Sequence, residues 1–349
     1  MKRIGIMLDW QIVQKAKDGK QSYEQLPYYV EIGKELGLEP VFFHPRHVNL
    51  HSDTVIGHFW NGRRLVSSKV PIPKVIHNRV LSGDPATRKM IRELGRSRKV
   101  FNGIVVRDKL KVHKMLWDNY LVRPYLPQTV AFQPRALERF LSTYPVIYVK
   151  PAVGSVGEGV VRIEPAGKQY WLISSGMKKV LPKSRLLREL ERWVGSRRFI
   201  IQEAVPLACY RGSTFDIRVS VQKNGERKWG VSGMVAKVAN PNNRLSNLAR
   251  GGMAVSINAV FSSLFPEEKA NRVKALLSHA AVEIAKQYEK FFPSLADLGL
   301  DMGIDKHGAP YLIEINVRDQ RYSFYKAGEV EMFKRTYQRP MEYAKSFLK

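Results

Sequence analysis

Residues 298–316 read LGLDMGIDKHGAPYLIEIN, which predicts two apolar strands joined by a short turn at Lys306 to Gly308. Glu314 and Asn316 are two residues apart on the second strand, so their side chains share one face. Asp301, on the first strand, can reach the same point. Oxygen ligands that include two carboxylates suit Mg²⁺, which keeps waters and phosphate oxygens at its other positions. The segment therefore predicts a magnesium site, and the alternative is a hairpin with a solvated acidic face.

A strand-like run that ends at Lys150 leads into a glycine-rich segment, PAVGSVGEGVV, at residues 151–161. Glycine adopts backbone conformations that other residues avoid, and the N–H groups of such a loop can close over phosphates. Ser155 and Gly157 lie in the centre of the loop, and Lys150 would meet the phosphate charge. No Gly-Lys-Ser/Thr sequence follows, so this is not a Walker A loop. The alternative is an ordinary hairpin turn of similar composition.

Two later segments place polar side chains on apolar strands. The run FIIQEAV delivers Gln202 and Glu203, as an adenine pocket at the junction of two lobes would need, and an edge strand is the alternative. The run FDIRVSVQ places Asp216 and Arg218 two residues apart, and therefore on one face of a strand. A buried acid and base are costly unless they pair with each other or serve a ligand. Both runs are therefore candidates for a binding site.

The first hundred residues alternate short apolar runs with polar helical stretches, which is typical of an α/β domain. The pattern predicts strands at 4–8, 40–43 and 74–77 and a helix at 24–36. A hairpin is predicted at residues 58–65, because Asn61-Gly62 suits the positive φ angles of a type I′ turn.

Three helices are predicted further along the chain. A helical stretch follows Lys109 and ends before Pro124, and a domain boundary is expected at its start. Residues 184–194 carry apolar side chains on one face, and residues 266–288 have the apolar spacing of a helix that packs against a sheet.

The composition, 44% hydrophobic and 26% charged, is that of a globular protein. No window approaches the roughly 18 apolar residues of a membrane span, and the N-terminus lacks the apolar stretch and cleavage site of a signal peptide. A cytoplasmic location is therefore predicted. The single cysteine, Cys209, cannot form an internal disulfide. A buried small side chain is expected there, with a reactive thiol as the alternative.

A formal net charge of +27 produces a positive field that attracts anions. Basic residues cluster between Arg88 and Arg123 and between Lys178 and Arg198, which indicates an acidic or polyanionic partner. The alternative is a solvated surface that keeps the protein soluble. Nucleic-acid binding is a further hypothesis that rests on charge alone, because no helix-turn-helix, zinc-finger or RNA-recognition signature is present. Such binding would be non-specific.

The motifs, taken in order, resemble those of the ATP-grasp ligases, and the RimK-like ligases are the nearest familiar group. They are Arg107-Asp-Lys109, Lys150 with its glycine-rich segment, Gln202-Glu203, Asp216-Ile-Arg218, Ser246-Asn-Leu-Ala-Arg250-Gly-Gly252, Asp301 and Glu314-Ile-Asn316. The N-terminal half, with Pro73 to Arg79 and Leu126 to Thr129, resembles the YheC/YheD group of endospore-forming bacteria. The resemblance implies an α/β ATP-grasp fold with a pre-ATP-grasp domain at 1–106, a small lobe at 107–200 and a large lobe at 201–349.

The resemblance also implies roles for individual residues. Lys109, Lys150, Ser155 and Gly157 would contact the ATP phosphates, and Gln202, Glu203 and Val205 would hold adenine. Asp216 would lie toward the ribose. Asp301, Glu314 and Asn316 would bind Mg²⁺, with Mn²⁺ as the alternative, and Arg218 and Arg250 would face the transferred phosphate.

The activity implied is that of a carboxylate-amine ligase, in which Mg-ATP converts a carboxylate to an acyl-phosphate that an amine then attacks. The alternative is a non-catalytic, ATP-binding or structural spore-associated protein that kept the fold. One departure from the family pattern concerns the substrate pocket. Many relatives follow the metal-binding Asn with a small residue, Pro and Gly, whereas Arg318 and Arg321 follow Asn316 here. These arginines are predicted either to recognise a carboxylate by bidentate contacts or to be surface residues.

Overall fold

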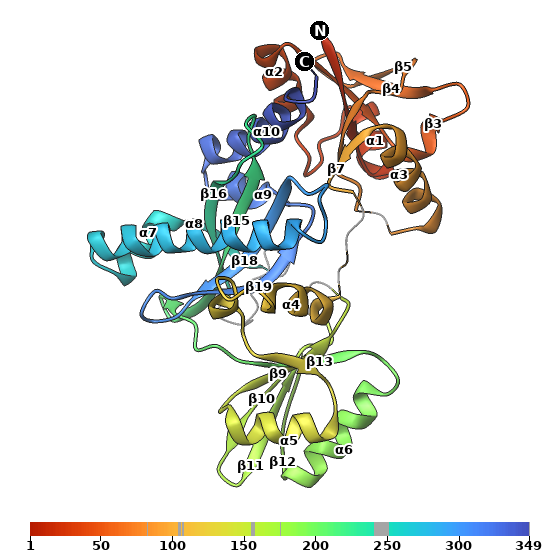
Figure 1. The fold of residues 1–349 in the computed structure, drawn as a ribbon. Helices are drawn as coiled ribbons and strands as arrows, with labels where there is room; N and C mark the ends of the chain where they lie inside the picture. The colour runs from red at the N-terminus through yellow and green to blue at the C-terminus, as the bar shows by residue number, and fades with distance from the viewer. Residues whose placement is uncertain are drawn as a thin grey trace.

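The computed structural model describes residues 1–81, 83–103, 106, 108–154, 158–174, 176–240 and 251–348. In these ranges the strands form three sheets, one from the N-terminal hundred residues, one from the middle of the chain and one from the C-terminal half (Figure 1). Helices pack against the sheets, so the predicted α/β class is confirmed. None of the described helices has the length and apolar character needed to cross a membrane.

The N-terminal sheet has the strand order β3-β4-β2-β1-β6-β7, with β5 paired to β4. Its strands are β1 (Lys2–Met7), β2 (Leu38–Phe43), β3 (Val48–Asn49), β4 (Thr54–Trp60), β5 (Leu65–Pro71), β6 (Val75–Asn78) and β7 (Lys99–Phe101). Its helices are α1 (Trp10–Lys17), α2 (Leu26–Leu36) and α3 (Pro85–Ser97), with a 3-10 turn at Pro45–His47. The strands and the helix predicted for this region are confirmed.

The predicted hairpin between β4 and β5 is present, but its turn is not type I′. The loop spans residues 61–64, and Gly62 has a φ of +98°, whereas Asn61 is not among the residues with positive φ. The Asn61 side chain instead accepts hydrogen bonds from the backbone N–H groups of Arg63 and Arg64, at 3.0 and 2.9 Å. A side-chain oxygen thus closes a longer loop than the Asn-Gly pair predicts.

The middle sheet has the order β12-β11-β10-β9-β13-β8. Its strands are β8 (Thr129–Ala131), β9 (Ile147–Pro151), β10 (Val161–Ala166), β11 (Gln169–Ser174), β12 (Met177–Leu181) and β13 (Phe199–Glu203). Helices α5 (Pro134–Thr143) and α6 (Lys183–Val194) pack on one face and share an apolar core with the sheet. Because β13 lies between β9 and β8, the edge-strand interpretation of this segment is wrong.

The C-terminal sheet has the order β17-β16-β15-β18-β19, with β14 paired to β15. Its strands are β14 (Cys209–Tyr210), β15 (Ser213–Lys223), β16 (Trp229–Val238), β17 (Met253–Ser256), β18 (Asp297–Ile304) and β19 (Pro310–Asn316). The helices around it are α4 (Lys109–Trp117), α7 (Ile257–Leu264), α8 (Glu267–Glu289), α9 (Tyr322–Lys326) and α10 (Val330–Lys345), and a 3-10 turn lies at Arg123–Tyr125. The predicted hairpin of residues 298–316 and the helices predicted after Lys109 and at 184–194 and 266–288 are confirmed.

Helix α10 returns the chain to the N-terminal domain (Figure 1). It packs along α2, where the rings of Tyr28 and Tyr337 stack with centroids 5.5 Å apart. One apolar core contains residues of β1, α2 and α10, whereas the middle sheet and its two helices have a core of their own. The N-terminal and C-terminal parts therefore form one packed unit, and the middle sheet faces that unit as a separate lobe.

Cys209 is exposed, so the expectation of a buried side chain is wrong. Successive side chains of a strand point to opposite sides. In the short strand β14, Tyr210 takes the buried side, and Cys209 is left on the outer one.

Candidate functional site

A cleft between the middle sheet and the C-terminal sheet contains two adjoining cavities of about 520 and about 460 Å³. Both are lined by Lys109, Lys150, Gln202, Asp216 and Glu314. The two cavities are therefore parts of one site, and residues that are far apart in the sequence meet there.

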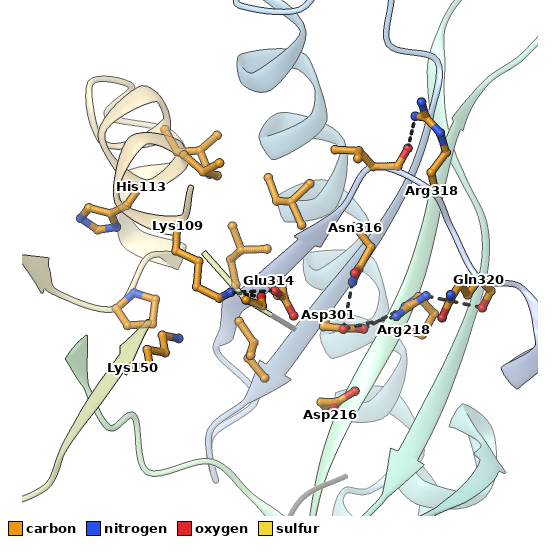
Figure 2. A pocket seen from close by; sticks show the side chains of 18 of the residues that line it. Lys109, His113, Lys150, Asp216, Arg218, Asp301, Glu314, Asn316, Arg318 and Gln320 are labelled. Carbon is orange, nitrogen blue, oxygen red and sulfur yellow. Dashed lines mark hydrogen bonds and ion pairs between the residues drawn. The ribbon is translucent and has the colours of Figure 1, made fainter. Parts of the chain in front are cut away.

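Asp301 lines the larger cavity and is the shared acceptor of a cluster of polar side chains (Figure 2). Its Oδ1 accepts hydrogen bonds from Arg218 Nε at 2.8 Å and from Lys237 Nζ at 2.9 Å. Its Oδ2 accepts from Arg218 Nη2 at 3.3 Å and from the Asn316 amide at 3.0 Å. Strand pairing explains this arrangement, because Asp301 lies opposite Arg218 on one side and opposite Glu314 on the other.

Electrostatics keeps this cluster ionised. Burial by itself would raise the pKa of Asp301, but Arg218 and Lys237 outweigh burial and hold that pKa well below its usual range. Burial by itself would lower the pKa of the Arg218 guanidinium, but Asp301 and Asp319 outweigh burial and raise that pKa. One carboxylate is thus shared by two cations at the wall of the cleft.

Lys109 enters the cleft from the first turn of α4. Its Nζ donates to the backbone oxygen of Gly154 at 2.7 Å and lies 3.2 Å from Glu314 Oε1 (Figure 2). The Asp108 side chain caps the helix by accepting a hydrogen bond from the backbone N–H of Lys111 at 3.0 Å. The cap fixes where the helix begins. The two contacts of Lys109 connect the glycine-rich segment to Glu314, a predicted metal ligand.

Lys150 lies on β9 at the same end of the cleft. Its Nζ donates to Gln202 Oε1 at 2.7 Å, and the Gln202 amide donates to Thr129 Oγ1 at 2.7 Å. Burial, together with the charge of Lys109, lowers the pKa of Lys150 to about 8. An anion bound beside Lys150 would favour its charged form.

Lys237, which no sequence motif marks, lies on β16 directly opposite Asp216. Its Nζ is 2.7 Å from Asp216 Oδ1, in addition to its contact with Asp301. Burial tends to lower the pKa of Lys237, but Asp301 and Asp216 outweigh burial and raise it. No motif surrounds this lysine, and only the pairing of β16 with β15 could have revealed it.

Arg318 and Arg321 are both buried, so their interpretation as surface residues is wrong. Arg321 Nη2 is 2.7 Å from Asp297 Oδ2, and its Nη1 donates to the Tyr29 hydroxyl at 3.2 Å. The carboxylate that Arg321 contacts is therefore that of Asp297, a residue of the protein itself. Arg318 lines the larger cavity and donates from Nε to the backbone oxygen of Val80 at 3.2 Å. It connects the N-terminal domain to the end of β19.

The predicted adenine-pocket residues Gln202, Glu203 and Val205 together line the smaller cavity. Arg162 and Tyr148 of the middle sheet line it too, and the sequence analysis found neither of them. The predicted site residues Ser155, Gly157 and Arg250 lie outside the described residues, and their roles stay predictions.

The predicted metal ligands Asp301, Glu314 and Asn316 all line the larger cavity. Strand register puts the two carboxylates opposite each other, and the Asn316 amide is within hydrogen-bond distance of Asp301. Two carboxylates and an amide oxygen are hard donors, so the residues present fit Mg²⁺ or Mn²⁺. Among the residues that the structure describes, no group of three or more His, Cys, Asp and Glu side chains could hold a metal ion, and the predicted set reaches three donors only with the Asn316 amide.

Comparison with known proteins identifies similar chains. A family model described as YheC/D like ATP-grasp matches residues 97–347. The endospore coat-associated protein YheD of Bacillus subtilis (strain 168) is 23% identical over 316 residues, which cover 86% of this chain and 69% of that protein.

Two solved structures share the fold. D-cycloserine synthetase DcsG has a TM-score of 0.55 at 11% identity, covering 97% of this chain and 99% of that one. A RimK domain protein ATP-grasp from Sphaerobacter thermophilus DSM 20745 has a TM-score of 0.53 at 12% identity, covering 99% of this chain and 100% of that one. At sequence identities this low, the two structures show that the fold is shared and nothing more.

Proposed function

The chain belongs to the YheC/D-like ATP-grasp family, and from that premise we propose that it uses Mg-ATP in its cleft to join a carboxylate to an amine. The ATP-grasp fold and the YheC/YheD resemblance predicted from the motifs are confirmed. The reaction is our proposal, and the name of one structural neighbour, a synthetase, is in keeping with it.

The observation that carries the proposal is the convergence of charge in the cleft. Lys109 reaches into it from α4 and Lys150 from β9 of the middle sheet, and Arg218 and Lys237 line it on the C-terminal sheet. Asp301, Glu314 and Asn316 lie among these cations. Phosphoryl transfer depends on positioning and charge neutralisation more than on covalent help from the protein. A wall of fixed cations beside a set of oxygen donors suits that requirement.

In the proposed reaction, Lys109 and Lys150 bind and orient the phosphates, and Glu203 with Val205 holds adenine in the smaller cavity. Asp301, Glu314 and Asn316 would hold the magnesium ion, which neutralises phosphate charge when bound. Asp216, which was predicted to lie near the ribose, pairs with Lys237 at the junction of the cavities. We therefore propose that Asp216 also orients the Lys237 side chain.

Arg218 and Lys237 are proposed to stabilise the transferred phosphate. A carboxylate oxygen of the substrate attacks the γ-phosphorus and ADP leaves; an amine then displaces phosphate from the acyl-phosphate and forms an amide. No nucleophile from the protein is required. Arg250 is proposed to act on the same phosphate as Arg218. The glycine-rich segment with Ser155 and Gly157 is proposed to keep water from the intermediate.

The carboxylate and amine substrates are proposed to be acidic or polyanionic, because the net charge of +27 attracts anions. We propose a cytoplasmic location, with spore association as the alternative that the likeness to YheD favours. The same likeness motivates a second candidate function, that of a non-catalytic, spore-associated protein that binds ATP. A protein that had lost the activity would be expected to have lost Lys150, Asp301, Glu314 or Asn316. All four residues are present in this chain.

ADP release tests the ligase. Purified protein is incubated with Mg-ATP and a panel of acids and amines, and ADP is measured against the Glu314→Gln variant. We expect at least one acid and amine pair to give ADP well above that control, because the variant removes a carboxylate that is proposed to hold Mg²⁺. If no pair exceeds the control while ATP still binds, the non-catalytic candidate replaces the ligase.

The pKa of Lys150 predicts how nucleotide affinity depends on pH. In the free protein Lys150 loses its proton above about pH 8, whereas bound phosphate raises its pKa. Affinity for Mg-ATP should therefore be highest below pH 8 and fall by up to about tenfold per pH unit above it. Calorimetric titration between pH 7.5 and 9.5 measures the slope. Lys150→Arg, whose guanidinium stays charged throughout, should abolish the slope; a slope that persists in this variant would assign the titration to another group.

A further inference from the structure

Arg162 is placed by the strand register against the smaller cavity. It lies on β10 directly opposite Tyr148 of β9, and Tyr148 lies opposite Gln202 of β13. These three side chains form a row across one face of the middle sheet. Their strand neighbours Val161 and Val149 belong to the core on the other face. The row therefore faces the cavity of about 460 Å³ that the proposed function gives to the nucleotide base.

The guanidinium of Arg162 is held in place from two sides. Its Nε donates to Glu164 Oε2 at 2.8 Å, and its Nη1 donates to the Tyr148 hydroxyl at 3.2 Å. Its central carbon lies 5.8 Å from the centroid of the Tyr148 ring. A guanidinium is planar, and two hydrogen bonds to different partners fix the orientation of that plane.

The C-terminal half of the chain contributes both polar and apolar side chains to the same cavity. Leu207 and Ile313 are among the apolar ones, and Asp216 and Glu314 are among the acidic ones. Ile313 occupies an irregular position in β19, where the register with β18 shifts between Asp301 and Met302. An extra residue of this kind re-aims a side chain. A flat ligand in this cavity would have both the fixed cationic plane of Arg162 and aliphatic side chains within the same lining.

We infer that Arg162 is a specificity residue that stacks on a purine base and makes the site prefer purine over pyrimidine nucleotides; this inference rests on the proposed function. Stacking of a base on an aromatic or guanidinium plane increases with the size of the π face, and a purine has two fused rings where a pyrimidine has one. Glu164 is then a positioning residue, since it holds the Arg162 plane without lining the cavity.

The test compares dissociation constants for Mg-ATP, Mg-GTP and Mg-CTP by calorimetry. The wild type should bind ATP at least about tenfold more tightly than CTP. Arg162→Met keeps the apolar stem and removes the plane; it should weaken ATP about tenfold and CTP less than about threefold, so the preference shrinks. Arg162→Lys keeps the charge and should behave like Arg162→Met. Glu164→Gln should give an intermediate ratio of ATP to CTP affinity.

Arg185→Met on α6 is the matched control, because Arg185 is exposed and also pairs with a glutamate, Glu189, at 3.5 Å. It should change neither affinity. Unfolding midpoints without nucleotide identify any variant that fails to fold. Equal weakening of ATP and CTP in Arg162→Met, or wild-type behaviour of Arg162→Lys, would overturn the inference while the proposed function stands. Absence of binding of all three nucleotides to the wild type would overturn both.

Discussion

Replacing Asp297 by alanine should lower the free energy of unfolding by about 3–5 kcal/mol, because it leaves buried cations without their carboxylate. Asp297 is fully buried. Its Oδ2 lies 3.2 Å from Arg79 Nη1 and 2.7 Å from Arg321 Nη2, and its Oδ1 accepts from the Gln222 amide at 2.8 Å. The two arginines hold the pKa of Asp297 below its usual range despite burial, which would raise it. Urea denaturation measures the loss.

The matched control is Lys334→Ala, which breaks an exposed pair between α10 and α2. Lys334 Nζ lies 2.6 Å from Glu31 Oε1, with both side chains open to solvent. Exposed pairs contribute at most about 1 kcal/mol, so this variant should be close to the wild type. If Asp297→Ala were as stable as Lys334→Ala, the buried cluster would not hold the N-terminal domain to the C-terminal sheet.

Replacing Arg218 by methionine should reduce the rate of ADP release by about 10²–10³-fold, which is the usual cost of removing one fixed group that stabilises a transition-state charge. Arg218 is held by Asp301 at 2.8 Å and by Asp319 at 3.1 Å, so its guanidinium is positioned before the substrate arrives. Affinity for Mg-ATP should change by less than about tenfold, because Lys109 and Lys150 remain. Steady-state ADP release and calorimetry separate the two quantities.

Arg218→Lys keeps the charge but cannot make the paired contacts with Asp301, so it should retain only part of the activity. The assay temperature is chosen below the unfolding midpoint of each variant, since Asp301 and Asp319 lose a partner. An Arg218→Met variant that releases ADP at the wild-type rate would remove Arg218 from the proposed reaction.

The sequence predicted those parts of the site that lie on single strands. Their spacing alone places Glu314 and Asn316 on one face of a strand. Asp301 is predicted to lie near them because a short turn makes its strand pair with theirs. Asp216 and Arg218 were found in the same way. Local spacing is thus enough where the functional side chains are two residues apart or joined by a tight hairpin.

The remaining site residues depend on contacts that no local pattern reveals. Lys237 becomes part of the site only through the pairing of β16 with β15, and Arg162 only through the pairing of β10 with β9. Arg321 can be buried because its guanidinium pairs with Asp297, which lies 24 residues earlier at the start of β18. Such long-range pairings are set by tertiary packing, so the sequence alone left Arg321 undecided between a ligand and the surface.

Thermal unfolding with and without Mg-ATP shows whether the cleft binds the nucleotide. A ligand at about 100 times its dissociation constant adds about 2.7 kcal/mol of stability, which should raise the midpoint of the wild type by several degrees. Lys150→Ala and Glu314→Gln should show a smaller rise. Lys168→Ala, which removes an exposed lysine in the turn between β10 and β11, should match the wild type. A wild type whose midpoint does not move, or site variants that shift as far as the wild type, would mean that the cleft does not bind Mg-ATP through these residues.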